Sequence, residues 1–273
     1  MERYLMVIFY SFLVLAFLFL AKKIADALTK YNDDAAVEQS GNMAVALRRS
    51  GLYVGMAIAM AGVMTGGLTK MELVLFIQDG AIATVIFFLA HYINDYAIIS
   101  GVRNNDLIKA GNVPTGLVEA GSFIATGILL NGAFTGEVGG LLPAIVFFIL
   151  AEIVLVAAIK IHQKIYKFNV TDCILKNNMS AGISVAGLLI SYSLILRPSI
   201  AGNFMGWWDS IGFFCLSALT GMIALIGFEK LADMIFLPKT RIEDDICSNN
   251  TAALVVVQGI TIALSLVIGR LLS

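Results

Sequence analysis

The chain has 273 residues, of which 59% are hydrophobic and 14% are charged. Because an average soluble domain carries about 25% charged residues, this composition excludes a water-soluble fold and predicts a protein embedded in lipid. The net charge of −1 offers no basic surface for nucleic acid. The three cysteines have no metal-ligand spacing and are too few for a disulfide framework.

Eight segments have, or approach, the length of about 20 mostly apolar residues that a membrane-spanning helix needs. In chain order they are 4–27, 44–68, 73–99, 115–136, 138–164, 179–197, 209–236 and 250–271. In the first segment Lys22 and Lys23 follow the apolar run, whereas a cleaved signal peptide has its positive charge before the run. We therefore expect a retained first span and an all-α, polytopic transmembrane helical bundle.

The basic residues predict the orientation of these spans. Most of the 18 lysines and arginines lie on the connections that follow the first, third, fifth and seventh spans, or at the adjoining helix ends. Cytoplasmic connections of membrane proteins are enriched in lysine and arginine. These connections are therefore predicted to be cytoplasmic, with both termini outside.

A two-helix repeat organises the sequence. In each unit the second helix is expected to begin at an asparagine, and a glycine follows nine positions later. The pairs are Asn42 and Gly51, Asn112 and Gly121, Asn178 and Gly187, and Asn250 and Gly259. Because each unit contains two spans, the four repeats are parallel in the membrane. The repeats form two pairs, the first over residues 1–136 and the second over 137–273. The sequence leaves open whether the four repeats close into one bundle or form two four-helix halves.

Small residues also lie two and thirteen positions after each asparagine, and with the glycine they form one narrow stripe along the helix. In lipid, such a stripe allows two helix backbones to approach closely. The second helices are expected to pack along it, either against the first helix of their unit or against each other. The asparagines suit helix N-caps, and the alternative is that they surround a shared cytoplasmic vestibule.

Four acidic residues are candidates for function. Three of them recur near the ends of the first helices, and these are Asp26, Asp95 and Asp233. They either belong to hydrophilic helix ends that project into water or form a cytoplasmic ring that attracts cations. Glu152 lies within the fifth span, where an ionisable group costs at least about 2.5 kcal/mol. It is either an intramembrane functional site or a glutamate held by a polar neighbour, for which Gln258, Ser184 and Asn131 are the candidates.

The asparagine, small residues two and usually four positions later, and a glycine at nine together resemble the bacterial family called domain of unknown function 350. This family includes YjfL-like inner-membrane proteins, and the resemblance covers nearly the whole chain in multiple tandem copies. Pro114 and Leu254 depart from the small residues of the pattern. The resemblance implies a multi-pass protein of the bacterial inner (plasma) membrane, without known catalytic residues. It also implies a link to membrane-stress proteins and to polyamine-related ligases.

No enzyme, cofactor or metal site is expected, because no HExxH, paired CxxC, phosphate-binding or dinucleotide-binding motif occurs. The first functional hypothesis is a scaffold in the bilayer that recruits soluble stress-response proteins through residues 29–41, 101–111, 167–177 and 238–249. The second is a channel or carrier for a small cation or polyamine that uses Glu152. A homo-oligomer is compatible with either hypothesis.

Overall fold

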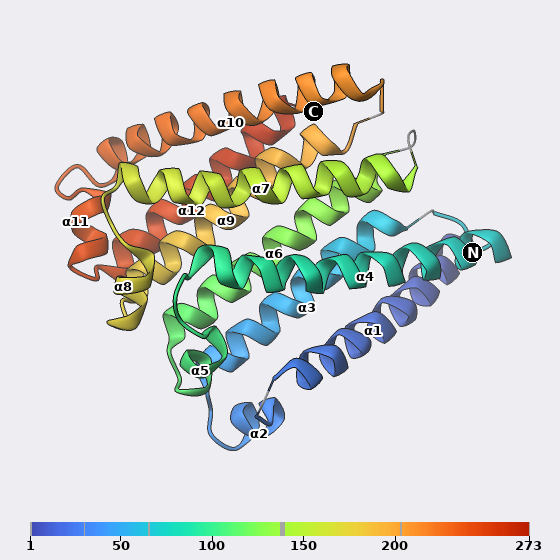
Figure 1. Cartoon of the computed structure of the whole chain (residues 1–273), viewed down its shortest axis with the longest axis horizontal. Coiled ribbons are helices and arrows are strands. Elements are labelled where there is room, and N and C mark those ends of the chain that lie inside the picture. Colours follow the sequence, from blue (N-terminus) through green and yellow to red (C-terminus); the bar gives the residue numbers. More distant parts are fainter. Residues whose placement is uncertain (1, 30, 65, 137–139, 203, 273) are drawn as a thin grey trace.

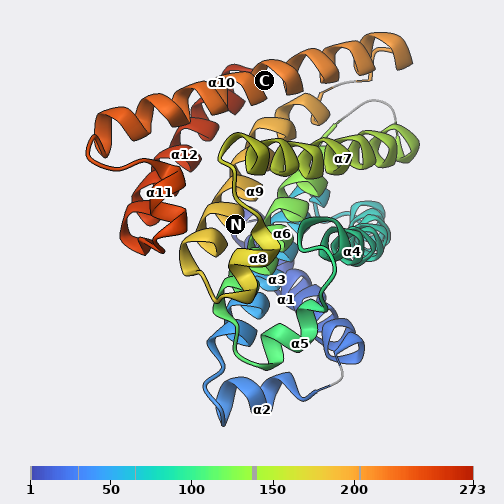
Figure 2. The same ribbon diagram turned by 60° about the vertical axis from the view of Figure 1, so that its left-hand side comes forward.

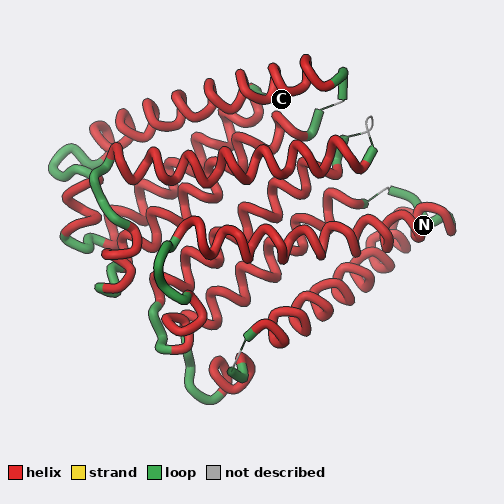
Figure 3. The backbone as a smooth tube through the Cα atoms, in the orientation of Figure 1, coloured by secondary structure: helices red, strands yellow, loops and turns green. Residues whose placement is uncertain are grey.

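The computed structural model describes residues 2–29, 31–64, 66–136, 140–202 and 204–272, where all regular secondary structure is helical (Figure 3). The expected boundary between the two halves falls at residues 137–139, outside the described residues. Each of the eight expected spans overlaps one helix of at least 21 residues. These helices are α1 (Glu2–Leu28), α3 (Met43–Val63), α4 (Lys70–Ile98), α6 (Val113–Phe134), α7 (Leu141–Ile165), α9 (Met179–Ile200), α10 (Trp207–Phe236) and α12 (Thr251–Leu271).

Four short helices lie where the sequence predicted only polar connections, and this is a correction. They are α2 (Asp33–Glu38), α5 (Asn104–Lys109), α8 (Val170–Leu175) and α11 (Ile242–Cys247). Each has an acidic residue in its first turn, where a carboxylate stabilises the helix dipole. All four lie at one end of the molecule, here called the short-helix end (Figures 1 and 2), and the start of α1 and the end of α12 lie toward the other end (Figure 1).

The long helices form two rows. The inner row contains α3, α6, α9 and α12 in this order, and the outer row contains α1, α4, α7 and α10 (Figure 1). The strongest helix pairings are α3 with α6, α6 with α9, and α9 with α12. The inner helices therefore form one continuous open row, so the molecule is neither a closed bundle nor two separate four-helix halves.

Glycines allow the inner helices to approach this closely. A Cβ atom added at Gly51 would overlap Ala120, one at Gly121 would lie 2.7 Å from the Ala186 Cα, and one at Gly187 would overlap a side chain of α12. The glycine stripe thus packs inner helices against each other, which decides between the two packing alternatives. In α12, the last helix of the row, a Cβ at Gly259 would meet nothing within 4 Å.

Among the described residues, seven of the eight long helices are long and apolar enough to cross a membrane. The exception is α3, in which Arg48 and Arg49 lower the mean hydropathy. Large apolar side chains on the outer row are exposed in the isolated chain, including Phe12 at 69% and Leu216 at 66%. Since soluble monomers rarely expose such continuous apolar surface, these side chains face lipid, and the chain is a multi-pass membrane protein.

Candidate functional site

The four repeat asparagines have the predicted structural role, because each is the N-cap residue of its inner helix. The sequence did not indicate their second bond. Three of them also donate through the side-chain amide to a backbone oxygen in the short helix of the following unit. These bonds are Asn42 to Ile108 at 3.0 Å, Asn112 to Ile174 at 2.8 Å and Asn178 to Ile246 at 2.7 Å. The asparagines therefore join successive units along a row and do not surround a shared vestibule.

The three recurring aspartates do not form a ring, which corrects that alternative. Asp26 pairs with Arg49 at 3.1 Å, and Asp95 lies 3.7 Å from His91. Asp233 accepts a hydrogen bond from the backbone of Ile242 at 3.4 Å. They belong to helices α1, α4 and α10, which are spread along the outer row (Figure 1).

Glu152 and Gln258 belong to different clusters. Glu152 on α7 accepts hydrogen bonds from Asn94 Nδ2 and from Thr126 Oγ1, each at 2.9 Å. The three partners expected for it, namely Gln258, Ser184 and Asn131, are wrong because α7 directs Glu152 toward α4 and α6. Gln258 instead donates to Glu229 at 3.4 Å.

A cavity of about 570 Å³ opens in the first half of the chain, near the short-helix end. Its walls come from the connection between α1 and α2, from α3, α4 and α5, and from Phe123 of α6. This volume lies within the range of small-ligand sites. A space of similar size between α1 and α3 has a mostly apolar lining, as expected for a surface that faces lipid.

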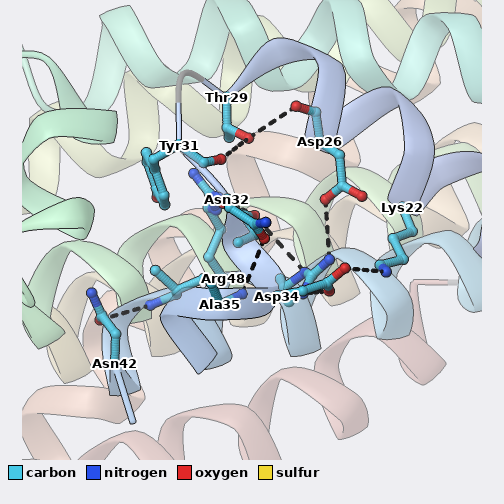
Figure 4. A network of polar contacts seen from close by, with 12 residues as sticks. Lys22, Asp26, Thr29, Tyr31, Asn32, Asp34, Ala35, Asn42 and Arg48 are labelled. Carbon is cyan, nitrogen blue, oxygen red and sulfur yellow. Dashed lines mark hydrogen bonds and ion pairs between the residues drawn. The ribbon is translucent and has the colours of Figure 1, made fainter. Parts of the chain in front are cut away.

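Ion pairs form one wall of this first-half cavity. Arg48 binds Asp33 at 2.6 Å and lies 4.0 Å from Glu119. Arg49 binds Asp34 at 2.6 Å, and Lys22 binds the same carboxylate at 2.8 Å (Figure 4). The two arginines had indicated only membrane orientation in the sequence, whereas in the structure they hold α2 against α3.

These ion pairs perturb the ionisable groups of the connection between α1 and α3. The hydrogen bonds from Lys22 and then Arg49 lower the pKa of Asp34 to about 2. Burial raises the pKa of Tyr31, whose ring lies against the Arg48 guanidinium, to about 12. Asp34 therefore stays ionised and Tyr31 stays neutral throughout the physiological range.

Beside Arg48, one imidazole and two carboxylates converge. Among the described residues, His91, Asp95 and Glu119 form the group able to hold a metal ion, with ligand atoms within 4.8 Å of one another. His91 and Asp95 are one helical turn apart on α4, so they share a face. The His91 ring stacks on Phe123, with centroids 3.7 Å apart and planes at 20°. Sequence motifs missed this group because its members lie on two helices without fixed spacing.

Three buried oxygen atoms near this group accept no hydrogen bond. They are Asp33 Oδ1, Asn104 Oδ1 and Glu119 Oε1, here called the acceptor cluster, and their residues are 2%, 6% and 2% exposed. The orientation of the Asn104 amide follows from its Nδ2 donating to Asp95 at 3.3 Å. Buried polar atoms are nearly always bonded in folded proteins. Asp33 and Asn104 line the cavity, so acceptors without donors at this place indicate room for a donor or a cation.

The second half has a closed counterpart to this site. Glu229 lies as many residues before Asn250 as His91 lies before Asn112. Both Glu229 carboxylate oxygens accept hydrogen bonds, one from the Tyr166 hydroxyl at 3.2 Å and one from Gln258, and His162 Nε2 lies 2.9 Å from the carboxylate. The second half therefore satisfies its own buried carboxylate at the place where the first half leaves acceptors open.

Comparison with known proteins gives a family and a relative. Residues 1–134 and 137–272 each match the Domain of Unknown Function (DUF350) family. A UPF0719 transmembrane protein of Aquifex aeolicus (strain VF5) is 21% identical over 230 residues, which cover 81% of this chain and 83% of that protein. No solved structure matches. The family resemblance seen in the sequence is confirmed, and the family model covers the chain in two copies.

Proposed function

The chain belongs to the DUF350 family, whose two copies account for nearly its whole length, and on this premise we propose that the first copy binds a small cation. The binding site is the first-half cavity with the acceptor cluster. The proposal assigns binding and no catalysis. It is independent of Glu152, whose carboxylate is already engaged by two donors on α4 and α6.

The observation that carries the proposal is the acceptor cluster itself. Asp33, Asn104 and Glu119 come from α2, α5 and α6, and each has one buried oxygen without a donor. Asp33 and Asn104 line the cavity, and Glu119 lies 4.0 Å from Arg48, which also lines it. A buried acceptor that stays unsatisfied costs about 1–3 kcal/mol. A cation or an ammonium group would satisfy such an oxygen, whereas an anion would add repulsion.

The two arginines beside the cavity do not oppose this assignment. Arg48 is matched by Asp33, and Arg49 by Asp34 and Asp26, through contacts of 2.6 to 3.1 Å. Their charges are therefore balanced within the ion-pair network. Asp95 lines the cavity and then supplies a carboxylate that faces an entering cation.

We also infer the membrane topology that such a site requires. Eight spans as four like-oriented hairpins would put α2, α5, α8 and α11 in the cytoplasm and both termini outside. The position of all four short helices at one end supports this inference (Figure 2), as does the excess of basic residues on their connections. The cavity would then open to the cytoplasm from the bacterial inner membrane.

Thermal unfolding of the purified full chain in lipid nanodiscs tests the proposed function. The midpoint would be measured with K⁺, Mg²⁺, Ca²⁺, Mn²⁺, Zn²⁺ and spermidine in turn. We expect at least one cation to raise the midpoint, because a ligand at 100 times its Kd stabilises a protein by about 2.7 kcal/mol. Glu119→Gln should remove this rise, and the control Glu229→Gln should retain it. The proposal is refuted if none of the cations raises the midpoint, or if the midpoint rises equally in both variants.

Recruitment of soluble stress-response proteins stays a second prediction. One observation favours it: the four short helices lie at the same end (Figure 2), and α11 carries the exposed Asp244 beside the partly exposed Glu243. Charge reversal at these two residues should then abolish capture of partners from solubilised native membranes. Unchanged capture would remove this second function. A carrier that works through Glu152 has no comparable observation in its favour.

A further inference from the structure

We propose that the bound cation is a divalent first-row transition metal ion, held by an imidazole nitrogen of His91 and by carboxylate oxygens of Asp95 and Glu119. This inference rests on the proposed cation binding and makes its ligand specific. No known motif or family description assigns a metal to this chain. The assignment comes from the meeting of three side chains on two helices.

The geometry suits a metal ion of this size. The three ligand atoms already lie within 4.8 Å of one another. Metal–nitrogen and metal–oxygen bonds of about 2.0–2.2 Å require separations of roughly 3–3.5 Å between ligand atoms. Side-chain rotation alone can close this difference, because His91 and Asp95 are partly exposed to the cavity at 13% and 27% of their side-chain surfaces.

The supporting contacts prepare these ligands for a metal. Stacking on Phe123 holds the plane of the His91 ring, and Phe123 lies one turn after Glu119 on the same helix. The Asn104 amide donates to Asp95 Oδ1. Ligating imidazoles and carboxylates are commonly fixed by such outer contacts, whose loss typically weakens metal binding by about 10- to 100-fold.

The chemistry of the ligands selects the class of ion. Imidazole nitrogen is a ligand for zinc, iron, copper and nickel, whereas calcium and magnesium prefer sites made only of oxygen. An ammonium group would be accepted by carboxylates but would gain little from the His91 nitrogen. One imidazole with two carboxylates therefore favours a transition metal over calcium, magnesium or a polyamine.

Independent support comes from the unpartnered atoms. Glu119 is 2% exposed and its Oε1 accepts no hydrogen bond, and His91 Nδ1 is also buried without a partner. Arg48 lies 4.0 Å from the other Glu119 oxygen, but it is bound more closely to Asp33. The site thus keeps one carboxylate oxygen and one imidazole nitrogen free for a metal bond.

Titration with Co²⁺ tests the assignment through the visible absorption of the bound ion. The full chain in nanodiscs would be stripped with a chelator and titrated with Co²⁺, followed by competition with Zn²⁺. We expect one Co²⁺ per chain, displacement by Zn²⁺, and binding at least about 100-fold weaker in His91→Gln and in Glu119→Gln. The matched controls His162→Gln and Glu229→Gln change the closed cluster of the second half and should bind as the wild type does. If Glu119→Gln fails to fold, Asp95→Asn replaces it.

The outcomes separate this inference from the proposed function. If bound Co²⁺ gives no absorption but spermidine, Ca²⁺ or K⁺ stabilises the chain, the metal assignment is overturned and cation binding stays intact. If no cation changes the thermal midpoint or the absorption, the metal assignment and the proposed cation binding are both overturned. Equal weakening in the site variants and in the second-half controls would show that the metal lies elsewhere, and it would also overturn the assignment.

Discussion

Glu229 Oε2 lies 2.9 Å from His162 Nε2, at the position of the second half that His91 occupies in the first. Both residues of this pair are at most 1% exposed. The first half places an imidazole and an open cavity where the second half places a carboxylate with three partners. Two copies of one family domain have thus diverged, so that one has a candidate site and the other a closed polar core.

The asparagine contacts between units predict a loss of stability when they are removed. Asn112→Ala removes a helix cap and the hydrogen bond to Ile174, which together contribute about 2 kcal/mol. Asn250→Ala also removes a cap and one hydrogen bond, to Asp245 within its own unit, so we expect a similar loss there. Unfolding in sodium dodecyl sulfate mixed micelles measures both values, and a clearly smaller loss in Asn112→Ala would argue against the bond between units.

Two glycines of the inner row make opposite predictions. Gly127→Ala should destabilise the fold by about 1–3 kcal/mol, because a Cβ there would overlap the backbone of Gly55. Gly259→Ala meets nothing within 4 Å and should be neutral or stabilising by up to about 1 kcal/mol. The same micelle titration checks both variants. A destabilising Gly259→Ala would mean that the free face of α12 is covered.

The ion pairs of Asp34 predict how the stability of the fold depends on pH. Its pKa in the folded chain is about 2, below the ordinary value of about 3.9, so the ionised form is stabilised by folding. Its contribution is complete above about pH 4 and disappears as the pH falls toward 2. The difference in thermal midpoint between the wild type and Asp34→Asn should therefore be constant from pH 7 to about pH 4 and shrink below it. A difference that shrinks already near pH 6 would contradict the ion pairs with Lys22 and Arg49.

The two hydrogen bonds that Glu152 accepts predict that this residue has a structural role. Glu152→Leu leaves the Asn94 amide and the Thr126 hydroxyl without their acceptor and should cost about 1–3 kcal/mol. Glu152→Gln keeps one acceptor oxygen and should cost less. Cation binding, measured by the midpoint shift in nanodiscs, should survive in Glu152→Gln. Loss of that shift would move the binding site to Glu152 and favour the carrier hypothesis.

The sequence predicted the features that depend on local patterns. The eight apolar segments gave the long helices, and the asparagine with its glycine gave the start of each inner helix and its packing face. Short helices of six residues escaped because they have neither apolar length nor periodicity. Two of them, α2 and α8, are capped by Asn32 and Asn169, which resemble ordinary loop residues in the sequence.

The candidate site could not be predicted because it depends on contacts between units. Arg48 and Glu119 are far apart in the sequence and meet only because α3 and α6 pack along their glycines. His91 reaches Glu119 from a third helix. Glu152 drew attention because it is a charge in an apolar run, although its two donors lie on helices whose packing the sequence left open.

Anomalous diffraction from crystals of the full chain grown with Zn²⁺ tests the central claim most directly. The account predicts one zinc peak in the first half, within about 2.0–2.2 Å of the side chains of His91, Asp95 and Glu119. It predicts no peak at Glu229 and His162, whose atoms bond to each other. Zinc at the second-half cluster, or a first-half cavity without zinc at saturating concentration, would contradict the account.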